Sequence, residues 1–265
     1  MTFFDNISGD FSLVMINRDR VIRIFSEYVS DYDASDPKIR LKIDHTYRVA
    51  GLCETIAGKV GVDKDIAWLC GILHDIGRFE QVRRYNTFSD AKSVDHAGLS
   101  LEILFGEGLL DRFEVDLDDV QRRILEKAIG NHSLYRLEHG LSEAEQTYCN
   151  ILRDADKIDI FRVNCDTPME EIYNVTTQEL KSSPVSPEVK DCFMGQTAVL
   201  RSLKKYPADH IVGHICLVFE LVYPVSREIA KEQGYIGKML DFKSDNSETV
   251  EWFRFMNEQL KDYHR

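Results

Sequence analysis

The 265-residue sequence predicts an all-α protein, and three observations lead to this expectation. Apolar residues recur at three- and four-residue spacing along most of the chain, which is the pattern of amphipathic helices. Strand patterns, in which apolar and polar residues alternate, are scarce. Capping signals mark expected helix ends, for example Ser142 with Glu145 three residues later, a capping-box pattern.

The expected helices follow one another with short connections. In chain order they cover residues 10–32, 38–59, 63–75, 93–105, 117–131, 142–161, 209–223, 226–233 and 247–261, and a short helix is expected after Pro168. Irregular structure is expected at residues 1–8, 33–37 and 181–187. Residues 79–90 are aromatic and basic without clean periodicity, so we expect an ordered loop there, and such loops often carry function.

Length and composition indicate an ordinary soluble globular protein of one large domain or two small ones, with 43% hydrophobic and 29% charged residues. No apolar run reaches the roughly 18 residues of a membrane span, and the first residues lack a basic-then-apolar pattern, so we expect neither a span nor a leader. The six cysteines are scattered and never form a C-x-x-C pair. We therefore expect buried thiols in a reducing cytoplasm and no membrane partner.

The formal net charge of −12 argues against an extended nucleic-acid surface, which needs lysine and arginine to displace counterions. It does not exclude a small anionic substrate, because a metal site can be locally positive on an acidic protein. The sequence carries no signal for an oligomeric state.

His74 and Asp75 stand side by side where an apolar helix is expected to stop at Gly77. Adjacent residues on a helix point about 100° apart, so the pair cannot act from one face. The two side chains can converge on one metal from two sides. Alternatively, the carboxylate can bridge two metals while the imidazole holds one.

Further residues of the types that bind metals surround this pair in the sequence. They are His45, His96, His132 and Asp156. They are spread over several expected helices, so only a bundle can gather them. A single helical histidine is more often a partly buried residue bonded to a carbonyl. Asp156, however, lies in an apolar stretch, and a buried aspartate needs a partner such as a metal to offset its desolvation.

The remaining histidines give weaker signals. His139 and His264 have no such context. His210 and His214 are spaced i, i+4, as two ligands on one helix would be, but they lack the adjacent glutamate of H-E-x-x-H. We expect them to have a structural role.

His45, the His74-Asp75 pair and Asp156 together resemble the four-part signature of the HD-domain superfamily, helical metal-dependent phosphohydrolases. The stretches GILHDIGR and ILRDADKID carry the pair and the last aspartate. His96 in DHAGLS and His132 in IGNHS match the subset that binds two metals. The resemblance implies an HD-type helical bundle in a single domain over 1–265. Its metal-binding core covers about 38–165, and a C-terminal helical extension covers about 166–265.

Carried over residue by residue, the resemblance implies two divalent ions such as iron, manganese or zinc. His45, His74 and Asp156 would hold the first ion, His96 and His132 the second, and Asp75 would bridge them. Such a pair of ions activates water and stabilises the attacking and leaving oxygens of a phosphoryl displacement.

Two basic residues next to the metal motifs are candidates for binding phosphate. Arg78 and Lys157 flank the motifs and, with Asp75, are the expected catalytic residues. For each of the two cations the alternative is an ordinary surface salt bridge.

The expected function is a metal-dependent phosphohydrolase that acts on a small phosphate ester, with nucleotides as the expected class. The alternative is a di-iron oxygenase of the same superfamily, similar to myo-inositol oxygenase, that acts on a small polar substrate. A metal-binding scaffold without turnover is a third reading, which a complete ligand set disfavours.

Overall fold

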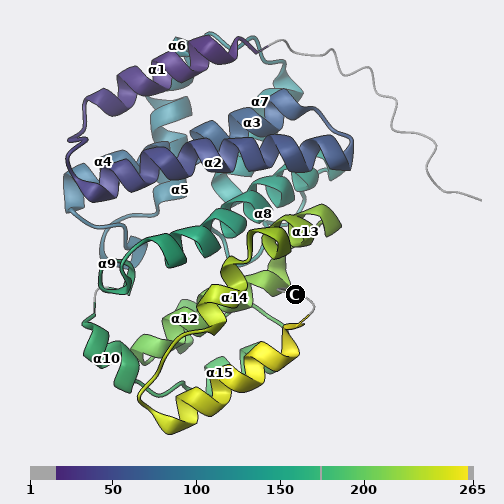
Figure 1. Cartoon of the computed structure of the whole chain (residues 1–265). Coiled ribbons are helices and arrows are strands. Elements are labelled where there is room, and N and C mark those ends of the chain that lie inside the picture. Colours follow the sequence, from purple (N-terminus) through teal and green to yellow (C-terminus); the bar gives the residue numbers. More distant parts are fainter. Residues whose placement is uncertain (1–15, 174, 262–265) are drawn as a thin grey trace, which may run out of the picture.

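The structure is a computed structural model that describes residues 16–173 and 175–261, and Figure 1 shows it as an assembly of helices. The all-α class is confirmed, since no strand occurs in the described part of the chain. The earlier helices are α1 (Arg18–Ser30), α2 (Pro37–Val60), α3 (Lys64–Leu73), α4 (Ile76–Tyr85), α5 (His96–Leu101), α6 (Leu109–Arg112), α7 (Asp119–Asn131) and α8 (Glu143–Asp166). The later helices are α9 (Met169–Tyr173), α10 (Thr177–Ser182), α11 (Pro187–Met194), α12 (Pro207–Ile215), α13 (Pro224–Gln233), α14 (Tyr235–Leu240) and α15 (Ser247–Gln259).

Four shorter helical segments complete the described secondary structure. They are the 3₁₀ turns η1 (Asp90–Lys92), η3 (Arg201–Leu203) and η4 (Cys216–Glu220) and the π-helical segment η2 (Glu102–Gly106). The expected irregular segment 1–8, the first residues of the expected helix 10–32 and His264 lie outside the described residues.

Helix α8 lies at the centre of the molecule (Figure 1). It packs against α2, α3 and α7 on one side and against α12, α13 and α14 on the other. Many of its apolar positions are fully buried, including Leu152, Ala155 and Ile158, and the expected Ser142 capping box fixes its start. Because α8 contacts helices from both parts, it joins the expected core at 38–165 to the expected extension at 166–265; that division stays a prediction.

Helices α2 and α3 approach each other closely at Gly71. A Cβ atom there would lie 2.6 Å from the Cα atom of Ala50, so only glycine allows this spacing. The approach brings the C-terminal end of α3 against the middle of α2. As a result, the His45 and His74 rings are 5.4 Å apart, centroid to centroid.

The chain breaks between α3 and α4 at the His74-Asp75 pair. His74 is the C-cap of α3, and Asp75 occupies the N-cap position of α4. The expectation that the helix continues to Gly77 is wrong, because Gly77 lies inside α4. An N-cap aspartate usually accepts a hydrogen bond from its own helix, but the Asp75 carboxylate makes no such bond and is free for other partners.

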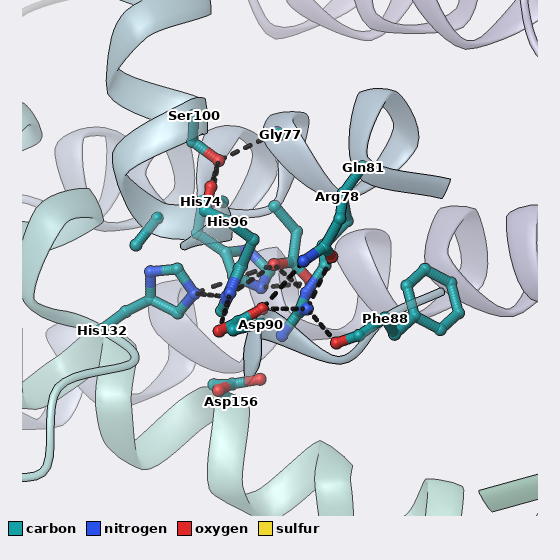
Figure 2. Close-up of polar contacts among 12 residues, drawn as sticks. His74, Gly77, Arg78, Gln81, Phe88, Asp90, His96, Ser100, His132 and Asp156 are labelled. Carbon is teal, nitrogen blue, oxygen red and sulfur yellow. Dashed lines mark hydrogen bonds and ion pairs between the residues drawn. The ribbon is translucent and has the colours of Figure 1, made fainter. Parts of the chain in front are cut away.

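Gly77 allows α4 to pack directly on α5. A Cβ atom at Gly77 would lie 2.5 Å from the carbonyl oxygen of His96 and 2.6 Å from the backbone nitrogen of Ser100. The Ser100 hydroxyl accepts a hydrogen bond from the Gly77 N–H and lies 2.9 Å from the carbonyl oxygens of His74 and His96 (Figure 2). The contact between α4 and α5 fixes the His74-Asp75 pair relative to His96.

Gly77→Ala is therefore expected to destabilise the protein by about 1–3 kcal/mol, the usual cost of overpacking, because the backbone of α5 cannot move aside. Gly51→Ala is the matched control. Gly51 also lies within a helix, but nothing is within 4 Å of its Cβ position, so alanine should stabilise by about 0.5–1 kcal/mol. Urea unfolding of both variants measures the two changes. Equal effects would contradict the close-approach argument.

The expected loop at 79–90 is wrong over its first half, which forms most of α4. Phe79 and Val82 are buried three residues apart on one face of this helix. Arg83, Arg84 and Tyr85 are exposed. Because these residues follow the short apolar face directly, the helical periodicity of this segment is weak in the sequence. Only residues 86–89 and the η1 turn remain outside α-helix.

Other boundaries also differ from the expectation. The helix expected at 93–105 begins at His96, capped by Asp95, and ends in π-helical η2. The helix expected at 209–223 ends at Ile215 and continues as η4. The expected loop 181–187 is shorter, because its ends belong to α10 and α11. The sequence patterns missed α6, α10, α11 and α14, which are short and therefore give weak periodicity.

The cysteines form no disulfide, and four of the six are buried. Within residues 16–173 and 175–261, each helix is too short or too polar to cross a membrane.

Candidate metal centre

The structure brings the six expected ligands together from five helical elements. His45 comes from α2, His74 and Asp75 from the α3–α4 break, His96 from the start of α5, His132 from the C-cap of α7 and Asp156 from α8. The four imidazoles are at most 6% exposed. Three three-residue groups have ligand atoms within 4.8 Å of one another. Two consist of expected ligands, namely His45, His74 and Asp156, and His74, Asp75 and His132; the third joins His96 to Asp90 and Asp95.

Asp75 lies at the centre, and each of its oxygens faces a different pair of histidines. Oδ2 is 3.6 Å from Nε2 of His45 and 3.4 Å from Nε2 of His74. Oδ1 is 3.5 Å from Nε2 of His96 and 3.7 Å from Nε2 of His132. We call these the Oδ2 half-site and the Oδ1 half-site. A carboxylate placed in this way can bridge two ions.

One histidine in each half-site is fixed by a backbone carbonyl. Nδ1 of His74 lies 2.7 Å from the carbonyl oxygen of Gly71, and Nδ1 of His132 lies 2.7 Å from that of Ile129. A carbonyl only accepts, so Nδ1 carries the proton and Nε2 presents its lone pair to the centre. Arg153 also fixes the end of α7, since its Nη1 donates to the carbonyl oxygen of His132 at 3.3 Å.

The second histidine of the Oδ2 half-site is fixed by a buried ion pair. Nδ1 of His45 lies 2.6 Å from Oδ2 of Asp159. Arg48 donates to both oxygens of this carboxylate, with Nε 2.5 Å from Oδ1 and Nη2 2.9 Å from Oδ2. Outer carboxylates of this kind orient a ligating imidazole and increase its basicity.

The Oδ1 half-site contains an equivalent pair, shown in Figure 2. Nδ1 of His96 lies 2.8 Å from Oδ2 of Asp90, and Oδ1 of Asp90 accepts from Nη1 of Arg78 at 2.8 Å. Gln81 adds a donor to the same oxygen at 2.9 Å. Each half-site therefore has one histidine held by a carbonyl and one held by an aspartate–arginine pair.

The candidate ligand atoms suit a cation because lone pairs on neighbouring imidazole nitrogens point at one another. Nε2 of His96 and Nε2 of His132 are 2.9 Å apart, although both rings carry their protons on Nδ1. Burial lowers the pKa of His96 to about 4, so at neutral pH this ring is uncharged. Two unprotonated nitrogens at this distance repel each other, and a metal ion between them would remove the repulsion; two ligands at right angles on a metal about 2.1 Å away lie about 3 Å apart.

A cation is also favoured between His45 and Asp156, whose Nε2 and Oδ1 atoms are 3.1 Å apart. Burial and Lys42 oppose protonation of His45, but its bonds to Asp156 and Asp159 outweigh them and raise its pKa. The Nε2 atoms of His45 and His74 are both buried and make no hydrogen bond. A metal ion in the Oδ2 half-site would satisfy both nitrogens and the carboxylate.

Lys42 is a residue of the centre that the sequence reasoning missed. Its Nζ lies 2.7 Å from Oδ2 of Asp75. Burial alone would raise the pKa of Asp75, but Lys42 and His74 outweigh this effect and hold the pKa well below its usual value. The central carboxylate is therefore ionised, as a ligand must be. A lysine three residues before His45, on the same helix face, was the available signal.

The two predicted phosphate-binding cations have different surroundings. Nη1 of Arg78 is bonded to Gln81, Asp90 and the Phe88 carbonyl, while its buried Nε has no hydrogen-bond partner and lies 3.7 Å from Oδ1 of Asp75. Lys157 is 8% exposed. It makes no hydrogen bond or ion pair among the described residues, and burial lowers its pKa to about 8.

The outer partners Arg48, Asp90, Asp159 and Arg153 were also missed. Asp159 lies in the ILRDADKID stretch, three residues after Asp156 and therefore on nearly the same face, which was a usable signal. Asp90 carries no such signal, because its position depends on the path of the chain after α4.

A cavity of about 410 Å³ lies at the C-terminal end of α8, lined by Asn164, Cys165, Asp166, Thr167, Pro168, Met169, Tyr173, Ile211, Lys238 and Met239. None of the six expected ligands lines it.

The other paired histidines lie outside the centre. His214 stacks on Tyr173 with ring centroids 5.6 Å apart, and its Nδ1 is 3.3 Å from the Tyr173 hydroxyl. His210 lies 6.0 Å from the same ring. These contacts fit the structural role expected for both.

Comparison with known proteins supports the HD superfamily for the first half of the molecule. Residues 43–160 match the sequence model of the HD domain, a stretch that contains all six expected ligands and covers somewhat less than half of the chain. HD domains bind divalent metals, and the superfamily consists of metal-dependent phosphohydrolases. The match therefore supports a hydrolase of this broad type.

A curated relative is ribonuclease Y of Mycoplasma genitalium, which is 24% identical over 139 residues. The similarity covers 52% of this chain but only 23% of that protein. No solved structure gives a significant match.

Proposed function

We propose that this protein is a metal-dependent phosphohydrolase that hydrolyses a small phosphate ester, with nucleotides as the first class to test. The observation that carries the proposal is the placement of Asp75, whose two oxygens each face two imidazole Nε2 atoms. The Oδ2 half-site, completed by Asp156, and the Oδ1 half-site would each hold one divalent ion. Imidazole and carboxylate ligands suit iron, manganese or zinc.

The chemistry that two such ions supply is a lower pKa for a nucleophilic water and neutralisation of phosphoryl charge. The chain's own residues provide the rest. The carbonyl and aspartate contacts at Nδ1 keep each imidazole in the tautomer that presents Nε2. Lys157, which has no described partner, and the unbonded Nε edge of Arg78 are the proposed contacts for phosphate oxygens.

The side of the centre that reaches solvent is lined by charged side chains. Lys42 and Asp156 are each 18% exposed at the side chain, and Arg78 is 14% exposed, while Asp75 is only 3% exposed. This low exposure of the central carboxylate fits a small substrate better than a polymer. The name of the relative, ribonuclease Y, points to RNA, whose phosphodiester presents the same chemistry, so RNA belongs among the substrates to test.

The test is hydrolysis of a panel of nucleotides, cyclic nucleotides and a short RNA, with Mn²⁺, Fe²⁺ or Zn²⁺ supplied in turn. We expect release of phosphate or a nucleoside monophosphate from at least one member, at equal rates in air and under anaerobic conditions. The di-iron oxygenase alternative gives a different result. Strict dependence on iron and oxygen, with no phosphate released, would replace our proposal with that activity.

A further inference from the structure

We propose that Lys42 competes with the metal ion for Asp75, and so weakens metal binding in the Oδ2 half-site while it stabilises the metal-free protein. This inference rests on the proposed metal centre. Nothing in the HD match or in the ligand set assigns a role to this residue.

The first step is the contact itself. Nζ of Lys42 lies 2.7 Å from Oδ2 of Asp75, the same oxygen that faces His45 and His74. Neither imidazole is hydrogen-bonded to that oxygen, since the Nε2 atoms of His45 and His74 have no hydrogen-bond partner. Lys42 is therefore the cation that neutralises the Oδ2 side of a carboxylate that is only 3% exposed.

The second step is electrostatic. A divalent ion held by His45, His74 and Asp156 would also use Oδ2 of Asp75, and two cations at one oxygen repel each other strongly at a buried site. One of them must lose part of its contact. Lysine can move, because a compact ammonium on a four-carbon stem has several rotamers, and the Lys42 side chain is 18% exposed.

The third step identifies where Lys42 can go. Its Nζ already lies 5.7 Å from the centre of the Phe88 ring, which attracts cations through its face. Phe88 is only partly buried, so a lysine that leaves Oδ2 can stay over this ring and reach solvent. The Oδ1 half-site differs, because the cation that faces Oδ1 of Asp75 is Arg78, whose Nε lies 3.7 Å away and whose Nη1 is held by Gln81, Asp90 and the Phe88 carbonyl.

The experiment is a calorimetric titration of chelator-stripped protein with Mn²⁺, on the wild type, Lys42→Met and the matched control Lys38→Met. Lys38 is an exposed lysine one turn earlier on α2, with no described ion pair. We expect Lys42→Met to bind one Mn²⁺ about tenfold or more tightly, while Lys38→Met matches the wild type. Thermal melts provide the second readout: the difference between chelated and Mn²⁺-saturated protein should widen in Lys42→Met.

Combining Lys42→Met with a second substitution, His96→Ala or His45→Ala, assigns the change in Mn²⁺ affinity to one half-site. The tightening should persist in His96→Ala, which retains the Oδ2 half-site, and disappear in His45→Ala. Weaker or unchanged Mn²⁺ binding in Lys42→Met, with an unchanged thermal difference, would overturn the inference, and so would tightening that survives in His45→Ala. If the wild type itself binds no metal, the proposed metal centre fails instead, so the two failures are distinguishable.

Discussion

Asp75→Ala is expected to remove both metal ions and abolish hydrolysis. The substitution deletes Oδ1 and Oδ2 together, and each faces two histidines in a different half-site. Loss of an outer partner alone typically costs about 10–100-fold in metal affinity, so loss of a shared ligand should exceed about 100-fold at each half-site. Elemental analysis and the rate of phosphate release measure the two consequences.

Asp44→Ala is the matched control for this variant. Asp44 is an exposed carboxylate beside His45, and it makes no described contact with the centre. The control should keep two ions per chain and wild-type kcat/KM. Circular dichroism excludes unfolding as the cause of any loss. An Asp75→Ala protein that is folded and still binds two ions would show that Asp75 does not bridge them.

The candidate ligands could be found in the sequence because they lie in short, recognisable stretches. GILHDIGR and ILRDADKID carry three of the six residues, and helical periodicity places each stretch in or beside a buried helix. Their convergence could not be derived from periodicity. It depends on close contacts such as the one between Gly71 and Ala50, which fixes how α3 lies on α2.

The outer partners were harder to predict because their signals are weak. Arg48 and Asp159 are 111 residues apart in sequence and meet only through the packing of α2 on α8. Asp90 reaches His96 because the chain after α4 turns back across α5. Lys42 carried no signal except its place on the helix face of His45. Long-range ion pairs of this kind are a product of tertiary packing and leave no local pattern.

The same packing explains how an acidic protein can favour an anionic substrate at one place. The net charge is −12, yet each outer carboxylate of the centre is paired with an arginine: Asp159 with Arg48, and Asp90 with Arg78. These four charges cancel locally. The two ligand carboxylates would then carry two divalent ions, with Lys42 and Lys157 nearby, which leaves the centre positive.

The two outer pairs should control the two half-sites separately. Asp90→Asn is expected to weaken metal binding in the Oδ1 half-site by about 10–100-fold, because His96 loses a charged partner for its Nδ1–H. Asp159→Asn is expected to have the same effect in the Oδ2 half-site, through His45. Each variant should therefore retain about one ion per chain at a metal supply that gives two in the wild type. Elemental analysis at that supply measures the loss, with His96→Ala and His132→Ala as references for an emptied Oδ1 half-site.

Asp95→Asn controls for the loss of a carboxylate close to His96. Asp95 caps α5 by accepting from the backbone nitrogens of Ala97 and Gly98, and asparagine caps equally well. This variant should keep both ions. The decisive result is that each variant loses the ion of a different half-site. The Asp90 and Asp159 variants change the charge by the same amount at equivalent positions, so a general effect of charge would not separate them. If both variants lose both ions together, the two half-sites do not bind independently, and the pairs act on the centre as a whole.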